Sequence, residues 1–185
     1  MAIKQKPVLV VMMGHIGSGK SYFARQLAET KKWVRLNGDS FRMAWLGSVE
    51  AIQAADLELK REGVFRGLDY AAQQILISGQ SVVYDSNNNK RVTRKTKEKI
   101  AQEASALPVL VWVKTTEEEA LMRIQTREPA VDQRKFDEPY AREVMERHIA
   151  ATDEPAVDEN VIEIDGTAPF KEQLAVFENG LQKYL

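Results

Sequence analysis

The chain has 185 residues, of which 44% are hydrophobic and 29% are charged, and its formal net charge is −1. This composition predicts one folded domain over residues 1–185 and excludes a global electrostatic attraction to nucleic acid or to anionic membranes. The absence of cysteine excludes disulfide bonds and thiolate chemistry, which suits a cytoplasmic protein. The apolar run over residues 8–13 is too short to span a bilayer, so we expect neither a signal peptide nor membrane insertion.

That apolar run is the first predicted element, a strand of the kind that is buried on both faces. The eight residues after it are Gly14, His15, Ile16, Gly17, Ser18, Gly19, Lys20 and Ser21. They match the phosphate-binding loop G-x-x-x-x-G-K-S, and a helix is predicted to start near Gly19. The glycines let the backbone aim N–H groups at an anion, Lys20 can reach the outer phosphates, and Ser21 can bind Mg²⁺. The sequence therefore predicts binding of a nucleoside triphosphate, with ATP and Mg²⁺ expected.

Strand-like and helix-like segments alternate along the rest of the chain. Gly63 and Gly67, one turn apart in a predicted helix, indicate close packing there. The alternation predicts an α/β fold with a parallel sheet covered on both faces, and ligands at the carboxyl ends of its strands. Further strands are expected at residues 33–36, 81–85, 109–113 and 161–164, and helices at 21–30, 39–46, 56–78, 92–104, 117–126, 139–151 and from about 170.

Two acidic segments follow predicted strands. Asp39 lies where the second strand leads into a helix, so it could accept the proton of an attacking hydroxyl, and Arg42 could hold an anionic group of the acceptor. The alternative is that Asp39 or Ser40 only caps the helix. Asp85 follows the third strand and could hold Mg²⁺ or orient the acceptor, with Asn87 beside it as a substrate contact. The alternative for Asp85 and Asn87 is a polar turn.

Arg123 and Arg127 are four residues apart at the end of a predicted helix, which places them on one helix face. Arg127 opens an irregular stretch over about residues 127–138. A segment of this kind could close over ATP, exclude water and neutralise charge on the transferring phosphoryl group. The alternative is a solvated, charged helix face.

Together these elements resemble the P-loop kinases, most closely the kinase domain of bacteriophage-type polynucleotide 5′-hydroxyl kinase. The resemblance implies a five-stranded parallel sheet, Asp39 as general base, Arg42 as a ligand for acceptor phosphate, and Arg127 as a lid arginine on the ATP phosphates. It also implies that Arg123 lies near the adenine or the phosphates and that the loop Gly166 to Pro169, with Thr167, borders the adenine. Tyr22, directly after the phosphate-binding loop, is also expected to contact ATP. The matching motifs are Gly14-x-x-Gly-Ser-Gly-Lys-Ser21, Asn37-x-Asp-x-Phe-Arg42, Lys60-Arg61-Glu62-Gly63, Asp85-Ser-Asn87 and Arg123-x-x-x-Arg127.

The acceptor is less well defined than the fold. Ser40 stands where the family often has a second acid, and Asp39-Ser40 also resembles the antibiotic phosphotransferases such as the chloramphenicol enzyme. A basic run over residues 90–99 could attract polynucleotide phosphates or could be a solvated helix face. We therefore expect a kinase acting on a polynucleotide 5′-OH, with a small metabolite or antibiotic as the alternative acceptor. A different class would be an ATP-binding switch.

Overall fold

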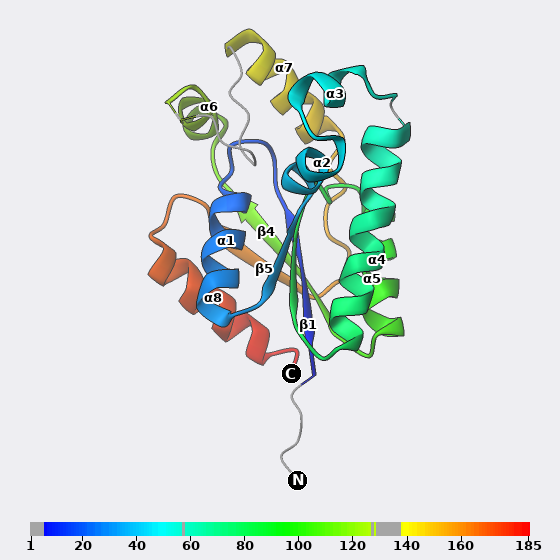
Figure 1. The fold of residues 1–185 in the computed structure, drawn as a ribbon. Coiled ribbons are helices and arrows are strands. Elements are labelled where there is room, and N and C mark those ends of the chain that lie inside the picture. The colour runs from blue at the N-terminus through cyan, green and yellow to red at the C-terminus, as the bar shows by residue number, and fades with distance from the viewer. Residues whose placement is uncertain (1–5, 57, 127, 129–137) are drawn as a thin grey trace.

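Five parallel strands form the central sheet of the protein, in the order β2-β3-β1-β4-β5 (Figure 1). The computed structural model describes residues 6–56, 58–126, 128 and 138–185. After β1 the chain moves to β2 on one side, whereas after β4 it moves to β5 on the other side, and such a reversal opens a crevice at the carboxyl ends. The predicted α/β class with a five-stranded parallel sheet is confirmed. The strands are β1 (Val8–Met13), β2 (Val34–Asn37), β3 (Val82–Asp85), β4 (Leu107–Lys114) and β5 (Val161–Asp165).

Helices cover both faces of the sheet. One face is covered by α1 (Lys20–Lys31) and α8 (Phe170–Gln182), and the other by α4 (Val64–Ile77) and α5 (Arg91–Glu103) (Figure 1). Among the helices in the described ranges, none is long and apolar enough to cross a membrane. The remaining helices are grouped near the carboxyl ends of the strands in Figure 1, and they are α2 (Gly38–Leu46), α3 (Val49–Ala54), α6 (Glu117–Thr126) and α7 (Glu138–Ala150).

Strand β1 anchors the loop that follows it, because all of its side chains are buried. Val8, Val10 and Met12 pack into the core beneath α1 and α8. The alternate residues of the strand pack into the core beneath α4 and α5. Each fully buried aliphatic side chain stabilises the fold by about 1.5–3 kcal/mol. The end of β1 is therefore a rigid starting point for the glycine-rich loop.

Two local features differ from the predicted elements. The predicted helix over residues 56–78 has a π-helical turn, η1 (Glu58–Gly63), ahead of α4. Such turns are rare and often occur at functional sites. Helix α3 was not predicted; it forms because the Ser48 hydroxyl accepts the Ala51 N–H at 3.1 Å and so starts a new helix after the predicted break.

Candidate active site

The phosphate-binding loop, residues 14–21, is shaped by three glycines with positive φ: Gly14 (140°), Gly17 (78°) and Gly19 (98°). A Cβ at Gly14 would lie 2.5 Å from the Val113 carbonyl oxygen. A Cβ at Gly17 would lie 2.6 Å from the Ala120 carbonyl oxygen. Both values are below any real Cβ contact, so side chains are excluded there and the loop backbone lies directly on β4 and α6.

The interior of this loop suits a polyphosphate. Lys20 begins α1, where the helix dipole is positive, and its Nζ donates to the His15 carbonyl oxygen at 2.6 Å. The Ser18 hydroxyl is buried and has no hydrogen-bond partner among the described residues. A buried polar group normally has a partner, so an unpaired one in a cradle of this kind fits an anionic ligand. The predicted triphosphate site is therefore consistent with the geometry of the loop.

Asp85 connects the phosphate-binding loop with the acceptor side. Its side chain is 2% exposed, and Oδ1 accepts the Ser21 hydroxyl at 3.0 Å. On the other oxygen, Oδ2, it accepts Arg35 Nε at 3.0 Å, Arg35 Nη2 at 2.5 Å and Asn37 Nδ2 at 2.8 Å. Arg35 and Asn37 were not assigned these contacts from the sequence. The sheet register, which places Asn37 opposite Asp85, is the feature that brings them together.

Ser21 and Asp85 supply oxygen atoms of the kind that Mg²⁺ prefers, which fits the predicted metal role of both residues. The described residues contain no group of three or more His, Asp or Glu side chains that could hold a metal ion by itself. A Mg²⁺ ion here would therefore take most of its ligands from phosphate oxygens and water, as is usual for this ion.

The start of α2 positions the predicted base. The Asn37 side chain caps the helix, because its Oδ1 accepts the Ser40 N–H at 2.8 Å. Asp39 is therefore not the cap, contrary to the alternative left open by the sequence. Its carboxylate lies in the first turn and accepts Arg42 Nη1 at 2.5 Å. Because Asn37 also donates a hydrogen bond to Asp85, the predicted base and the phosphate-binding loop are connected through a single carboxylate.

The asparagines after β3 hold the loop from the other side. Asn89 is buried, and its Oδ1 accepts the Gly14 N–H at 3.0 Å. Its carbonyl oxygen accepts the Asp153 N–H at 2.9 Å, which ties the segment after α7 to the same point. Asn88 is also buried and donates to the Met12 carbonyl at 3.0 Å. The sequence singled out Asn87, which is exposed and accepts the Asn89 N–H at 3.1 Å.

Arg123, which was predicted to contact ATP, lies beside the start of α1. Its Nη1 donates to the Gly166 carbonyl at 2.9 Å, and a Cβ on Gly19 would lie 3.6 Å from the same nitrogen. Gly166 packs tightly on the loop, since a Cβ there would lie 2.2 Å from the Ser18 carbonyl oxygen. Thr167 turns the chain by donating its N–H and hydroxyl to Asp165 Oδ1 at 2.8 and 2.6 Å.

Four further predicted contacts have different outcomes. Tyr22, in the first turn of α1, is 44% exposed. His15 contacts the Thr115 carbonyl through Nε2 at 3.1 Å, so it braces the loop. Arg127 and most of the predicted lid lie outside the residues that the structure describes. Ile16 packs against the small core between α6 and α7.

His148 on α7 is a candidate site residue that the sequence did not indicate. Its Nδ1 is buried and has no hydrogen-bond partner among the described residues. The pKa of its ring is lowered to about 4, first by burial and then by the positive charges of Lys20, Arg147, His15 and Arg61. These charges come from the phosphate-binding loop, from α7 and from η1. The ring is therefore neutral near pH 7 and lies close to the predicted phosphate site.

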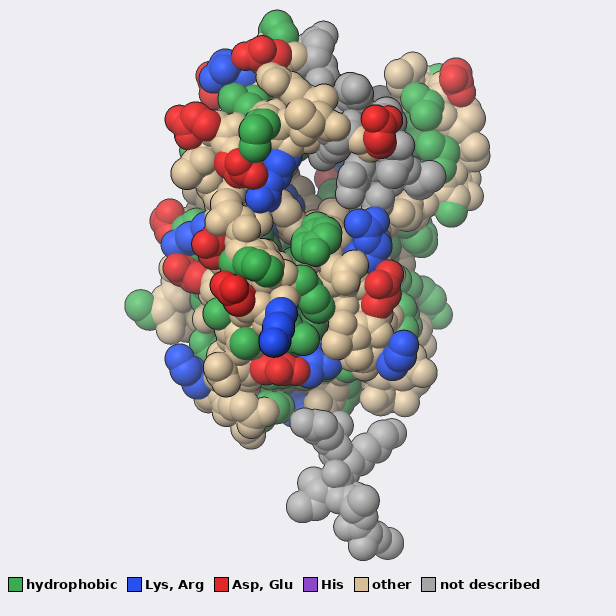
Figure 2. All heavy atoms as spheres, turned by 90° about the vertical axis from the view of Figure 1, so that its left-hand side faces the viewer, with side chains coloured by type: hydrophobic (Ala, Val, Ile, Leu, Met, Phe, Trp, Pro, Cys, Tyr) green, Lys and Arg blue, Asp and Glu red, His purple; other side chains and the backbone are tan. Residues whose placement is uncertain are grey.

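The basic run over residues 90–99 is engaged in ion pairs. Arg94 is 3% exposed and pairs with Glu159 at 2.7 Å, and Lys97 is 2% exposed and pairs with Asp69 at 2.5 Å. Figure 2 shows a different face of the protein from the one that carries α5, and there too the Lys and Arg side chains are interspersed with Asp and Glu side chains. The other ion pairs of the run are Arg91–Asp158, Lys95–Asp158, Lys95–Glu98 and Lys99–Glu103. Four of these pairs hold α5 to other segments, while Lys95–Glu98 and Lys99–Glu103 lie within the helix. The engagement of the run in these pairs weakens the case for a polynucleotide surface.

The sheet order and the glycine-rich loop at the end of β1 define a P-loop protein that binds a nucleoside triphosphate. The chain belongs to the AAA domain family AAA_33, because the model of this family matches residues 9–151. No curated protein sequence is significantly similar to it.

Solved structures share the fold. A sugar kinase from Janibacter sp. HTCC2649 has a TM-score of 0.69 at 18% identity, over 96% of this chain and 95% of that chain. A gluconokinase from Sinorhizobium meliloti 1021 has a TM-score of 0.65 at 18% identity, over 97% and 94%. A chain of the Pnkp1/Rnl/Hen1 RNA repair complex has a TM-score of 0.63 at 21% identity, over 81% of this chain and 46% of that chain. At these identities the likeness shows the fold alone.

Proposed function

We propose that the protein is an ATP-dependent kinase that transfers the γ-phosphate of ATP to a hydroxyl group of a small molecule. The observation that carries this proposal is the hydrogen-bonded chain from Ser21 through Asp85 to Asn37. It fixes the start of α2, and with it the Asp39 carboxylate, at the same edge of the sheet as the phosphate-binding loop. A P-loop with a carboxylate at this place suits transfer to a hydroxyl.

In the proposed reaction the loop N–H groups, Lys20 and the positive end of α1 hold the phosphates. Asp39 accepts the proton of the acceptor hydroxyl while that oxygen forms a bond to the γ-phosphorus. The bond from the γ-phosphorus to the β,γ-bridging oxygen breaks, and ADP leaves with the electron pair. Arg123 and, by the family resemblance, Arg127 neutralise phosphate charge. Mg²⁺ bound at Ser21 and Asp85 would supply further neutralisation of the β- and γ-phosphates.

A small acceptor is favoured over a polynucleotide for two reasons. The sugar kinase and the gluconokinase match this chain over nearly its whole length, whereas the RNA repair chain extends well beyond it. The basic run that favoured nucleic acid is held in intramolecular ion pairs. A polynucleotide 5′-OH stays the second candidate, because the RNA repair chain shares the fold over 81% of this chain. An ATP-binding switch would need no acceptor and would leave Asp39 without a role.

The test is transfer of labelled γ-phosphate from ATP·Mg²⁺ to a panel of sugars, sugar acids, hydroxylated antibiotics and 5′-OH oligonucleotides. We expect label on a small acceptor, and we expect Asp39→Asn to abolish transfer while leaving ATP binding nearly unchanged. Glu50→Gln is the matched control, because Glu50 is an exposed acid in the first turn of α3. Full transfer in Asp39→Asn would remove its role as base. ATP hydrolysis that no acceptor stimulates would favour the switch.

A further inference from the structure

Helix α7 packs against the phosphate-binding loop. Ala141 and Met145 of this helix are buried in a small core with residues of α6, and Ile16 of the loop packs against the same core. His148 follows Met145 by three residues, so the two side chains lie on the same face of α7. The helix therefore presents the His148 ring toward the loop, in the last turn before the helix ends.

The chain after α7 is tied to the same loop. The Asp153 N–H donates to the Asn89 carbonyl oxygen at 2.9 Å, and Asn89 Oδ1 accepts the Gly14 N–H at 3.0 Å. The Thr152 hydroxyl donates to the His148 carbonyl oxygen at 2.7 Å, which closes the end of the helix. His148 is therefore held at the loop by packing before it in the chain and by hydrogen bonds after it.

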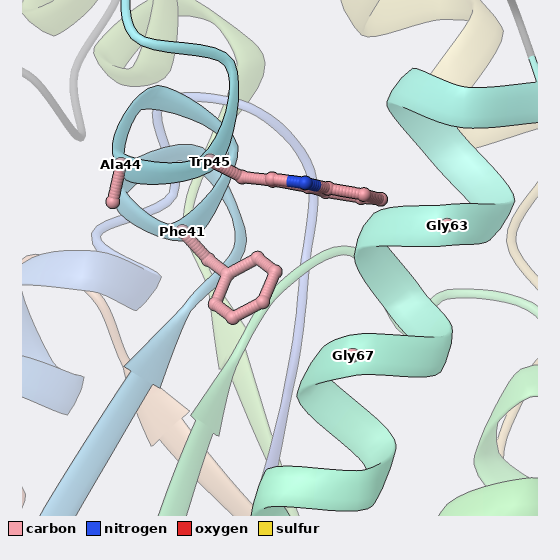
Figure 3. Close-up of a pocket in the computed structure, with 5 residues that line it drawn as sticks. All are labelled: Phe41, Ala44, Trp45, Gly63 and Gly67. Atoms are coloured by element: carbon pink, nitrogen blue, oxygen red, sulfur yellow. The ribbon is translucent and has the colours of Figure 1, made fainter.

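The π-helical turn η1, which carries Arg61, is held in place by its packing on α2. A Cβ on Gly63 would lie 2.8 Å from the Trp45 ring, and in Figure 3 the Trp45 side chain extends toward Gly63. One turn later a Cβ on Gly67 would lie 2.8 Å from the Phe41 ring, so both glycines provide the close packing that their spacing predicted. The hollow of about 330 Å³ at this contact is lined by Phe41, Ala44, Trp45, Gly63 and Gly67. None of these described lining residues carries a charge, so the hollow does not suit an anion.

Positive charge gathers around the His148 ring from several elements. The positive side chains that act on the ring, after burial, to lower its pKa are Lys20, Arg147, His15 and Arg61. Its Nδ1 is buried and has no hydrogen-bond partner among the described residues, although a buried polar atom normally has one. An unpaired nitrogen among positive charges fits an anionic ligand. The anion expected beside Lys20 is the terminal phosphate of ATP, because the lysine of this loop reaches the outer phosphates.

We propose that the His148 ring donates a hydrogen bond to the γ-phosphate of bound ATP. The inference rests on the nucleotide site of the proposed function and adds a phosphate-binding residue to it. Burial and the surrounding positive charges keep the ring neutral in the empty site, and a neutral imidazole still has one N–H to donate. A phosphate beside the ring opposes those positive charges, so it raises the pKa of the ring and favours the charged form. The ring then gains positive charge only when the terminal phosphate is in place.

A spectroscopic experiment on the wild-type protein tests this contact without any need for turnover. The protein contains two histidines, so labelling with ¹⁵N-histidine gives two sets of ring resonances, and His148→Gln assigns the set of His148. The probes are ADP·Mg²⁺ and the non-hydrolysable ATP analogue AMPPNP·Mg²⁺, which differ in the γ-phosphate. We expect AMPPNP to shift the His148 ring nitrogens and ADP to shift them much less. Equal shifts with the two nucleotides, or no shift with either, would overturn the inference.

An affinity experiment separates a phosphate contact from mere support of the loop. A hydrogen bond to a charged group is worth a factor of about ten or more in affinity, so His148→Ala should weaken AMPPNP binding about tenfold and leave ADP binding nearly unchanged. Ile149→Ala is the matched control, because Ile149 is the next residue of α7, is uncharged and is 39% exposed. An equal loss of affinity for both nucleotides in His148→Ala would mean that the ring only supports the loop, and would refute the contact.

This inference and the proposed function fail in different ways. A preference for AMPPNP over ADP that does not depend on His148, together with transfer to an acceptor, would refute the contact and keep the kinase. A preference that does depend on His148, without transfer to any acceptor, would refute the kinase and keep the contact. A wild-type protein that binds neither nucleotide would refute both.

Discussion

Asp85→Asn gives the sharpest test of the connection between the phosphate-binding loop and the acceptor side. The substitution keeps the shape of the side chain and removes the negative charge that faces Arg35. Asp85 is 2% exposed and the Arg35 side chain is 17% exposed, so the pair is largely withdrawn from water. Removing one partner of a buried ion pair costs about 3–5 kcal/mol. We expect the lower end, about 3 kcal/mol, because the amide still hydrogen-bonds and Arg35 keeps some contact with solvent.

The assay is thermal unfolding in Mg²⁺-free buffer, where a metal cannot contribute. For a chain of this size about 3 kcal/mol corresponds to a decrease in Tm of about 6–12 °C. Glu163→Gln is the matched control, since Glu163 pairs with Lys114 at 2.8 Å with both side chains about half exposed, and such pairs contribute about 0–1 kcal/mol. If Asp85→Asn melts at the same temperature as the control variant, the buried pair does not stabilise the protein by this amount. A second readout, the Mg²⁺ concentration required for ATP binding, should rise in Asp85→Asn, and an unchanged requirement would remove Asp85 from the metal role.

Three further predictions concern the surroundings of the site. The folded protein holds the pKa of His148 at about 4, below its ordinary 6.5, so the unfolded chain takes up a proton first as pH falls. The free energy of unfolding should therefore decrease as pH falls from about 6.5 to about 4. The urea midpoint of His148→Gln should decrease less over this range than that of the wild-type protein, and equal pH dependence of the two midpoints would contradict the prediction. Gly166→Ala should weaken ATP binding strongly, because its Cβ would lie 2.2 Å from the backbone of the phosphate-binding loop. Gly180→Ala is the control and should not weaken binding, because its Cβ would meet only a side chain of β5, at 2.9 Å. Equal ATP affinities of the two variants by calorimetry would argue against the Gly166 contact. Arg94→Met should lower the free energy of unfolding by about 3–5 kcal/mol, since it removes the ion-pair partner of the buried Glu159 carboxylate. The control, Lys99→Met, changes an exposed lysine and should cost less than about 1 kcal/mol. Similar denaturation midpoints of the two variants would favour the alternative that the basic run over residues 90–99 is a solvated helix face.

Local patterns in the sequence predicted most of the framework. The glycine spacing of residues 14–21 identified the loop, because glycine adopts positive φ without the steric cost that a side chain brings. The helix predicted over residues 117–126 has acids in its first turn, as the helix dipole prefers, and α6 has these bounds. The packing role of Gly63 and Gly67 was predicted from their spacing alone. Each of these features depends on neighbours within a turn or two, so the local sequence contains the information.

Contacts between distant segments could not be predicted in this way. The sequence did not single out Asn89, the Oδ1 of which accepts the Gly14 N–H across 75 residues of chain. It gave no signal for the position of His148 near Lys20, which depends on where α7 returns to the loop. The basic run was ambiguous from sequence, because its acidic partners lie on other segments.

By itself, the sequence of this protein determined a P-loop, its flanking strand and helix, and a carboxylate at the start of the next helix. Only the tertiary structure decided that Asp85 joins Ser21 to Arg35 and Asn37, and that an aromatic hollow lies beside the same helix. The physical reason is that backbone conformation follows from local residue types. The pairing of buried charges and the shape of a pocket follow from strand order and register, which place residues far apart in the chain side by side.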